Sequence, residues 1–101
     1  MRFEVAGETW RLYGDNGRMV AWAGETFAST SNATRAANAF KAGAATARYE
    51  VYQESGGNDW RWRAWRSSDK VASSGEDFAS KSNAERAAEN VRDNAGSAEG
   101  P

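Results

Sequence analysis

The sequence contains no cysteine and no histidine among its 101 residues. Without cysteine there is no disulfide framework, no thiolate metal site and no cysteine nucleophile. Without histidine the chain lacks the usual general base at neutral pH, and most zinc chemistry and Ser-His-Asp or Cys-His catalysis are excluded. An enzyme built on this sequence would therefore have to use carboxylates, lysine, tyrosine or serine.

Branched aliphatic residues are also scarce, because the chain has no isoleucine, one leucine and five valines. Its large side chains are mainly aromatic: five tryptophans, four phenylalanines and three tyrosines. So few branched aliphatics would indicate disorder in a highly charged chain, but the net charge here is -1. We therefore expect a folded chain whose core is aromatic and valine, with alanine between.

No apolar stretch approaches the roughly 18 residues of a membrane-spanning helix. The first residues alternate like a strand and do not form the apolar segment of a signal peptide. The near-neutral charge also argues against strong attraction of the whole surface to nucleic acid or anionic lipid. We expect a cytoplasmic protein with no membrane partner.

One segment of the sequence occurs twice. Residues 24–33 and 75–84 are identical at eight of ten positions, at an offset of 51. The similarity continues into the residues that follow and, with small shifts, into those before. We interpret the chain as a tandem duplication of one small unit.

Each copy alternates apolar and polar residues over three short segments and then changes to helical spacing. Ser82 and Glu85 have the spacing of a capping box at the start of the second helix, and Ser31 is the equivalent serine in the first copy. The sequence therefore predicts an α+β fold. Two strand-strand-strand-helix units form one antiparallel sheet with two helices on one face.

The predicted boundaries follow from the same patterns. Residues 1–44 are the first repeat, with a helix at about 31–42, and residues 45–95 are the second, with a helix at about 82–93. No linker separates the copies, so we expect a single domain. Residues 96–101 are small and polar, which predicts a disordered tail.

Four motifs of the second copy carry a resemblance to a known family. They are the aromatic-Glu-Val strand at Tyr49–Val51, then Trp60–Arg63, Val71–Glu76 and Phe78–Ala84. Their order resembles the YegP-like family of small bacterial and archaeal proteins of unknown function, over about residues 2–44 and 48–94. The resemblance implies a further strand after each helix, exchanged between the two units. It implies no catalytic residue, and residues 96–101 are poor in strand formers, so the last strand is expected to be short or missing.

The segment Trp60–Arg66 holds three arginines and three tryptophans without an acid. On a strand, Trp60 and Trp62 point to one face and the residues between them to the other. The alignment of the two copies adds residues of the first copy to that second face. The candidate partner-binding face consists of Arg11, Tyr13, Arg61, Arg63 and Trp65.

Different functions fit this face. Single-stranded nucleic acid binds such surfaces by stacking bases on rings while arginines meet phosphates. Alternatively, Glu4 and Glu50 lie on the same face, and cross-strand pairs with arginine simply stabilise the sheet. Tryptophan, tyrosine and arginine are also enriched in protein interfaces. We expect a non-enzymatic interaction or structural protein that binds another protein or self-associates through the open sheet face or edge, with single-stranded RNA or DNA binding as the alternative.

Two further features have a chemical and a structural interpretation. The helix starts at Ser29–Asn32 and Ser80–Asn83 have the groups to hold a phosphate or carboxylate, but serine there is usually a cap. Glu25 and Glu76 recur at equivalent positions and would suit acid–base chemistry or a divalent cation if paired. A glycine that closes the preceding strand explains their recurrence without chemistry. We expect no cofactor, metal or catalytic residue.

Overall fold

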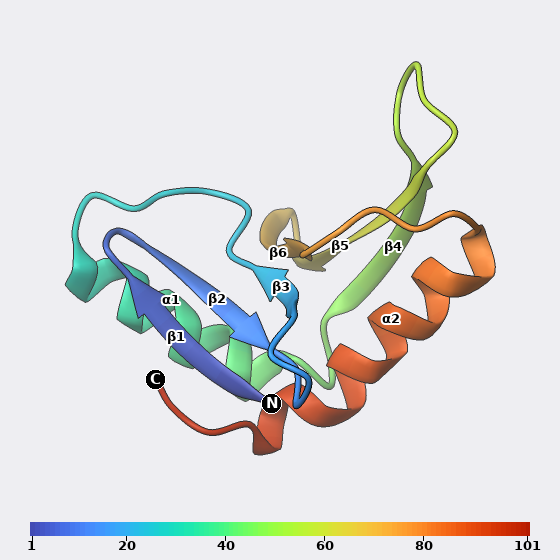
Figure 1. Cartoon of the computed structure of the whole chain (residues 1–101). Coiled ribbons are helices and arrows are strands. Elements are labelled where there is room, and N and C mark those ends of the chain that lie inside the picture. Colours follow the sequence, from blue (N-terminus) through green and yellow to red (C-terminus); the bar gives the residue numbers. More distant parts are fainter.

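The computed structural model describes all 101 residues and contains six strands and two α-helices (Figure 1). In chain order the elements are β1 (Arg2–Ala6), β2 (Thr9–Tyr13), β3 (Met19–Trp22), α1 (Thr30–Gly43), β4 (Arg48–Gln53), β5 (Trp60–Arg66), β6 (Asp69–Ser74) and α2 (Lys81–Asn94). A short 3-10 turn, η1 (Ala95–Ser97), follows the second helix. Three strands and a helix thus occur in the same order in each half of the chain.

All six strands belong to one antiparallel sheet, in the order β1-β2-β3-β6-β5-β4. Each half is a meander, and the third strands of the two halves meet at the centre. Only two register pairs join them, Ala21 with Ser74 and Trp22 with Ser73. The predicted α+β class with a single antiparallel sheet is confirmed.

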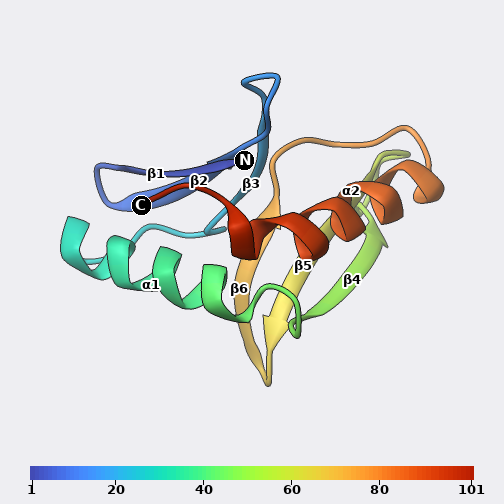
Figure 2. The ribbon, with the colours of Figure 1, turned by 90° about the horizontal axis from the view of Figure 1, so that it is seen from below.

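Both helices cover the same face of the sheet (Figure 2). Helix α1 contacts β1 and β2, whereas α2 contacts β4 and β5. Between these layers the ring of Trp10 stacks on Phe40 at 5.2 Å, and Phe3 meets Trp10 edge-on at 5.5 Å. In the other half, Trp62 lies beside Tyr49 at 5.6 Å. The large side chains of the core are therefore mainly aromatic, as expected, but Val91 is the one valine that is buried and most of the other buried residues are alanines.

Small residues on the helices make this close packing possible. The buried residues of the two helices are Ala33, Ala37 and Phe40 in α1, and Ala84, Ala88 and Val91 in α2. They follow the predicted helical spacing, so the two apolar stripes face the sheet as expected. Neither helix has the length and apolar character needed to cross a membrane.

The helices are capped two residues earlier than predicted. Ser29 and Ser80 are the caps, and each Oγ accepts a hydrogen bond from the backbone N–H three residues later, at 3.1 Å. Ser31 and Ser82 lie inside the helices, so the predicted capping box with Glu85 is wrong. Both serines of each pair have a side chain that can cap a helix. Because Ser29 and Ser80 are the caps, each helix extends one residue beyond the predicted bounds at both ends.

The same β-bulge occurs in both halves. The register of β2 with β3 shifts after Leu12, and the register of β5 with β6 shifts after Ala64. The extra residues are Val20 and Val71, which pack against the core. A bulge lets two successive residues share a face, and it changes the alternation in the rest of each strand.

The segment after α2 is ordered, in contrast to the predicted disordered tail. Ala98 is buried, and Glu99 pairs in parallel with Arg2 on the outer edge of β1. The N–H of Phe3 donates to the carbonyl of Glu99 at 2.8 Å, and the N–H of Glu99 donates to the carbonyl of Met1 at 3.0 Å. Composition predicts local propensity, but these long-range backbone bonds and the burial of Ala98 hold the segment in place.

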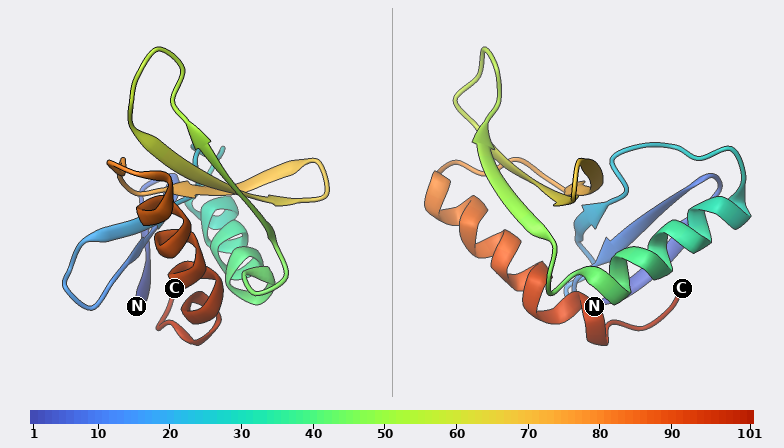
Figure 3. Two further views of the ribbon diagram at one scale, coloured as in Figure 1. Left: turned by 90° about the vertical axis from the view of Figure 1, so that its right-hand side faces the viewer. Right: turned by 180° about the vertical axis from the view of Figure 1, so that it is seen from behind.

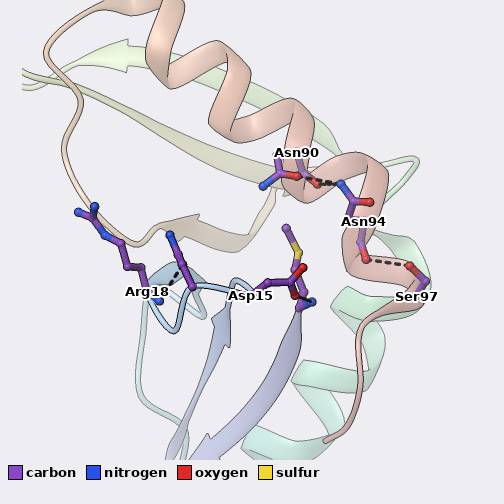
Figure 4. A network of polar contacts seen from close by, with 7 residues as sticks. Asp15, Arg18, Asn90, Asn94 and Ser97 are labelled. Atoms are coloured by element: carbon purple, nitrogen blue, oxygen red, sulfur yellow. Dashed lines mark hydrogen bonds and ion pairs between the residues drawn. The ribbon is translucent and has the colours of Figure 1, made fainter.

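Side-chain hydrogen bonds fix the turn that leads into this segment (Figure 4). Asn94 donates to the carbonyl of Asn90 at 2.9 Å, and Ser97 donates to the carbonyl of Asn94 at 3.2 Å. Nearby, the amino group of Met1 lies 2.9 Å from the carboxylate of Asp15. The end of α2, the chain start and the β2–β3 turn are thus held in one region.

Candidate functional site

The sheet has a second face that neither helix covers, and we call its outward side chains the open face. Strand β5 shows how it arises, because Trp62 and Ala64 are fully buried under the helices. Their neighbours Arg61, Arg63 and Trp65 point to the other side and are half-buried. The predicted alternation of this strand is therefore present in the structure.

Glu50 organises the second half of the open face. Its Oε1 accepts hydrogen bonds from Nε of Arg63 at 2.5 Å and from Nε1 of Trp65 at 3.1 Å. These two bonds, that from Arg63 first, hold the pKa of the Glu50 carboxyl below its ordinary value. The guanidinium of Arg63 also lies 4.2 Å from the ring centre of Tyr52. Arg63 and Trp65 are thus committed to contacts within the sheet.

Arg61 is also engaged inside the chain. Its Nε lies 3.1 Å from the carboxylate of Asp77, and its Nη1 lies 3.8 Å from that of Glu54. The side chain is 31% exposed. Arg61 and Arg63 of β5 are therefore neutralised by neighbouring acids, as the interpretation of the face as sheet stabilisation requires.

The first half of the open face is different. Arg11 lies opposite Glu4 in the register, but Glu4 is paired with Arg2 at 3.5 Å. Arg2 in turn lies 4.8 Å over the ring of Tyr13. Arg11 is exposed and makes no ion pair or side-chain hydrogen bond in the described chain. It is the unengaged arginine of the predicted set.

The register connects the two halves of the open face into one row. Across the six strands, in sheet order, this row reads Glu4, Arg11, Trp22, Ser73, Arg63 and Glu50. The sequence did not reveal that Trp22 belongs to this face, because the bulge shifts the alternation of β3. Arg48 and Tyr52 were also missed, although they alternate with Glu50 on β4 and that pattern was visible.

The open face has an excess of positive charge. The outward positions of β1, β2, β4 and β5 hold five arginines and two glutamates, which gives +3, and the Asp77 and Glu54 carboxylates beside Arg61 reduce this to +1, whereas the whole chain carries -1. Four aromatic side chains, all half-buried, lie among them: Tyr13, Trp22, Tyr52 and Trp65. Such a surface suits an anionic or aromatic-rich partner.

The other predicted sites do not gain support from the geometry. Glu25 and Glu76 line separate cavities, of about 170 and 140 Å³, and Glu76 is paired with Arg18 at 2.9 Å. The structure therefore does not bring them together as a carboxylate pair. No group of three or more His, Cys, Asp or Glu side chains has the arrangement needed to hold a metal ion. The helix-start serines act as caps.

One cavity of about 300 Å³ lies between the end of α1 and the β5–β6 hairpin. Phe40, Ala47 and Val71 contribute apolar surface, and Arg66 lies at its boundary. Its size is at the lower end of small-molecule sites, which span roughly 300–1,000 Å³. No acid and no catalytic pair lines it, so it offers binding surface without reactive groups.

A comparison with protein-family models, curated proteins and solved structures finds no match to this chain.

Proposed function

We propose that this chain is a small non-enzymatic interaction protein whose open face contacts another protein or a second copy of the chain. The composition of the face carries the proposal: five arginines and four aromatics occupy outward positions on the face of the sheet that no helix covers. Tryptophan, tyrosine and arginine dominate the energetic centres of protein interfaces. Arg11 is exposed and its guanidinium is unpaired, and Trp22 lies opposite it in the β2–β3 register.

The absence of paired reactive groups supports the non-enzymatic part of the proposal. The chain has neither histidine nor cysteine, and the recurring glutamates, Glu25 and Glu76, line different cavities. Glu50, whose carboxyl has a lowered pKa, is held in its charged form by two hydrogen bonds. A base held in this way has little proton affinity to use in catalysis.

Affinity capture with the purified chain tests the proposal. We expect a captured protein, or a second copy seen by light scattering, to be lost in Arg11→Glu and in Trp22→Ala. The matched control is Arg35→Glu, because Arg35 is an exposed arginine on α1, away from the sheet. Loss of the partner in Arg35→Glu as well, or retention in both open-face variants, would contradict the proposal.

The positive charge of the open face favours a second candidate, single-stranded RNA or DNA. Phosphates would meet Arg11, and bases would stack on half-buried rings such as Trp22, which lies opposite Arg11 in the register. We expect a labelled oligonucleotide to bind with a salt slope that falls by about 0.7 in Arg11→Ala, the value for one phosphate contact on a single strand. Arg35→Ala should leave the slope unchanged. Absence of binding at low salt removes this candidate.

Membership of the YegP-like family and a cytoplasmic location are also proposals. The family's fold implies a strand after each helix that is exchanged between units. The contact of Glu99 with β1 supports that arrangement after α2, because this segment reaches the first strand of the other half. After α1 the chain leads directly into β4, which pairs only with β5 of its own half. A chain without cysteine is compatible with a reducing compartment.

A further inference from the structure

The two outer edges of the sheet are not equivalent. The edge of β1 is covered, because Phe3 and Met1 exchange backbone hydrogen bonds with Glu99. Strand β4 pairs with β5 on one side, and no segment of the chain pairs with its other side. The chain therefore protects one edge with its own end and leaves the other free.

The free backbone groups of β4 can be identified from the ladder. The N–H of Glu54 donates to the carbonyl of Asp59, which continues the β4–β5 register. Bonded and non-bonded pairs alternate in an antiparallel ladder, so Tyr52 and Glu50 bond to β5. The alternate residues of the strand, Tyr49, Val51 and Gln53, therefore direct their N–H and C=O groups away from β5. At the β1 edge, the aligned residue Phe3 uses its N–H in the same way.

Of the features that keep exposed strands apart, this edge has only the charged side chains of Arg48 and Glu50. The segment Arg48–Gln53 contains no proline, glycine or lysine, and its register with β5 has no bulge. Natural sheets protect free edges with such devices or cover them with another segment. A six-residue edge with neither a proline nor a bulge is suited to accept a further strand.

We propose that the segment that covers this edge is β4 of a second copy, paired antiparallel about a twofold axis through Val51. The proposal goes beyond the interaction function proposed above, because it uses the edge of β4 and not the open face. In this register Val51 lies opposite itself, Tyr49 opposite Gln53, and Glu50 opposite Tyr52. The two six-stranded sheets become continuous across the axis.

Charge complementarity selects this register. It places Arg48 opposite Glu54 of the second copy at both ends of the pairing. The alternative with the axis through Glu50 would place that carboxylate opposite itself, and like charges directly opposite are destabilising. The chosen register pairs Tyr49–Gln53 within the strand and continues to Arg48 opposite Glu54.

The helix layer is complementary in the same arrangement. Glu85, Glu89 and Arg92 of α2 line a cavity of about 170 Å³ with Tyr49 and Val51, next to the free edge. Helix α2 runs against the direction of β4, with its end near the start of that strand (Figure 3). A twofold axis therefore brings Arg92 toward Glu85 of the second copy, twice. Neither Glu85 nor Glu89 has an ion-pair partner within the chain.

Sedimentation or light scattering over a range of concentrations tests the proposal. We expect the wild-type chain to dimerise and Gln53→Pro to abolish the dimer without unfolding the chain, since the N–H of Gln53 points away from β5. Single reversals Glu85→Arg and Arg92→Glu should each weaken association by about tenfold, and the double reversal should restore it. Arg86→Glu is the control, because Arg86 is an exposed arginine of α2 that does not line this cavity.

A chain that stays monomeric overturns the proposal, as does a dimer that tolerates Gln53→Pro. A dimer that is lost in Arg11→Glu and Trp22→Ala but not in Gln53→Pro places the interface on the open face instead. If the chain is a monomer but captures a protein partner that the open-face variants lose, the edge pairing is rejected and the proposed function stands.

Discussion

Gly75 follows β6, where the two halves of the sheet meet, and the backbone of β3 lies very close to it. Its N–H donates to the carbonyl of Val20 at 3.2 Å. A Cβ built on this residue would lie 2.2 Å from the carbonyl oxygen of Met19 and 2.7 Å from its carbonyl carbon. The Gly75→Ala substitution therefore forces β3 and β6 apart at the point where only two register pairs join them.

The size of the effect follows from this distance. The oxygen must retreat by about 0.8 Å to reach the 3.0 Å below which real contacts are essentially not seen. The obstacle is backbone, which cannot rotate away as a flexible side chain can. Overpacking costs about 1–3 kcal/mol, and partial loss of the seam hydrogen bond adds to it, so we expect Gly75→Ala to lower the unfolding free energy by about 3 kcal/mol. For a domain of this size that corresponds to a fall in Tm of about 12–24 °C.

Gly43 is the matched control, since nothing lies within 4 Å of a Cβ placed there. It ends α1 with an ordinary backbone conformation, so Gly43→Ala should stabilise the chain by about 0.5–1 kcal/mol through the unfolded state. Urea unfolding followed by tryptophan fluorescence measures both variants. The argument fails if Gly75→Ala has the stability of the wild type, or if both glycines respond alike.

Three further outcomes follow from other contacts. Because the pKa of Glu50 is lowered in the fold, the contribution of this carboxylate to stability is complete above pH 4.5 and is lost as the pH falls through the folded pKa. The wild type should therefore lose more stability between pH 7 and pH 3 than Glu50→Gln does. Equal losses would contradict this. Ser29→Ala and Ser80→Ala should each cost about 1 kcal/mol in urea unfolding, whereas Ser31→Ala and Ser82→Ala, inside the helices, should cost little; the reverse order would restore the caps predicted from the sequence. Deletion of residues 98–101 should lower stability by about 1–3 kcal/mol and speed hydrogen exchange of the Phe3 amide; unchanged exchange at Phe3 would show that the edge contact is not made in solution.

The local part of the fold could be predicted because it depends on periodicity. Alternation placed Trp62 and Arg63 on opposite faces, and helical spacing placed Ala37 and Phe40 on the buried side of α1. The repeated segment then transferred each assignment to the other half. Local pattern was sufficient at these positions because strand and helix geometry alone decide which way a side chain points.

The misses depend on contacts between residues far apart in the chain. The place of Trp22 on the open face follows from a bulge at Val20, and nothing in the sequence of β3 announces an extra residue. The order of Glu99 depends on β1, almost a full chain length away. Even the equivalent glycines of the two halves are needed for different reasons. Gly24 has a positive φ of 80°, whereas Gly75 leaves no room for a side chain beside the backbone of Met19.

The candidate site shows the same limit. Residue types predicted an arginine-aromatic face, but not which of its arginines is free. That depends on competition: Glu50 pairs with Arg63, whereas Glu4 pairs with Arg2 and leaves Arg11 unmatched. The choice is made by side-chain geometry on neighbouring strands, which periodicity does not contain.

The pairing of Phe3 with Glu99 also bears on how the chain is threaded. Because the first and last strand-like residues lie side by side, the path of the backbone is nearly a closed ring. A short linker between the ends, with a new opening in the exposed turn at residues 45–46, would give a circular permutant in which β4 comes first. Each strand would keep its neighbours in the sheet. The fold thus depends on which segments meet and not on which half is synthesised first.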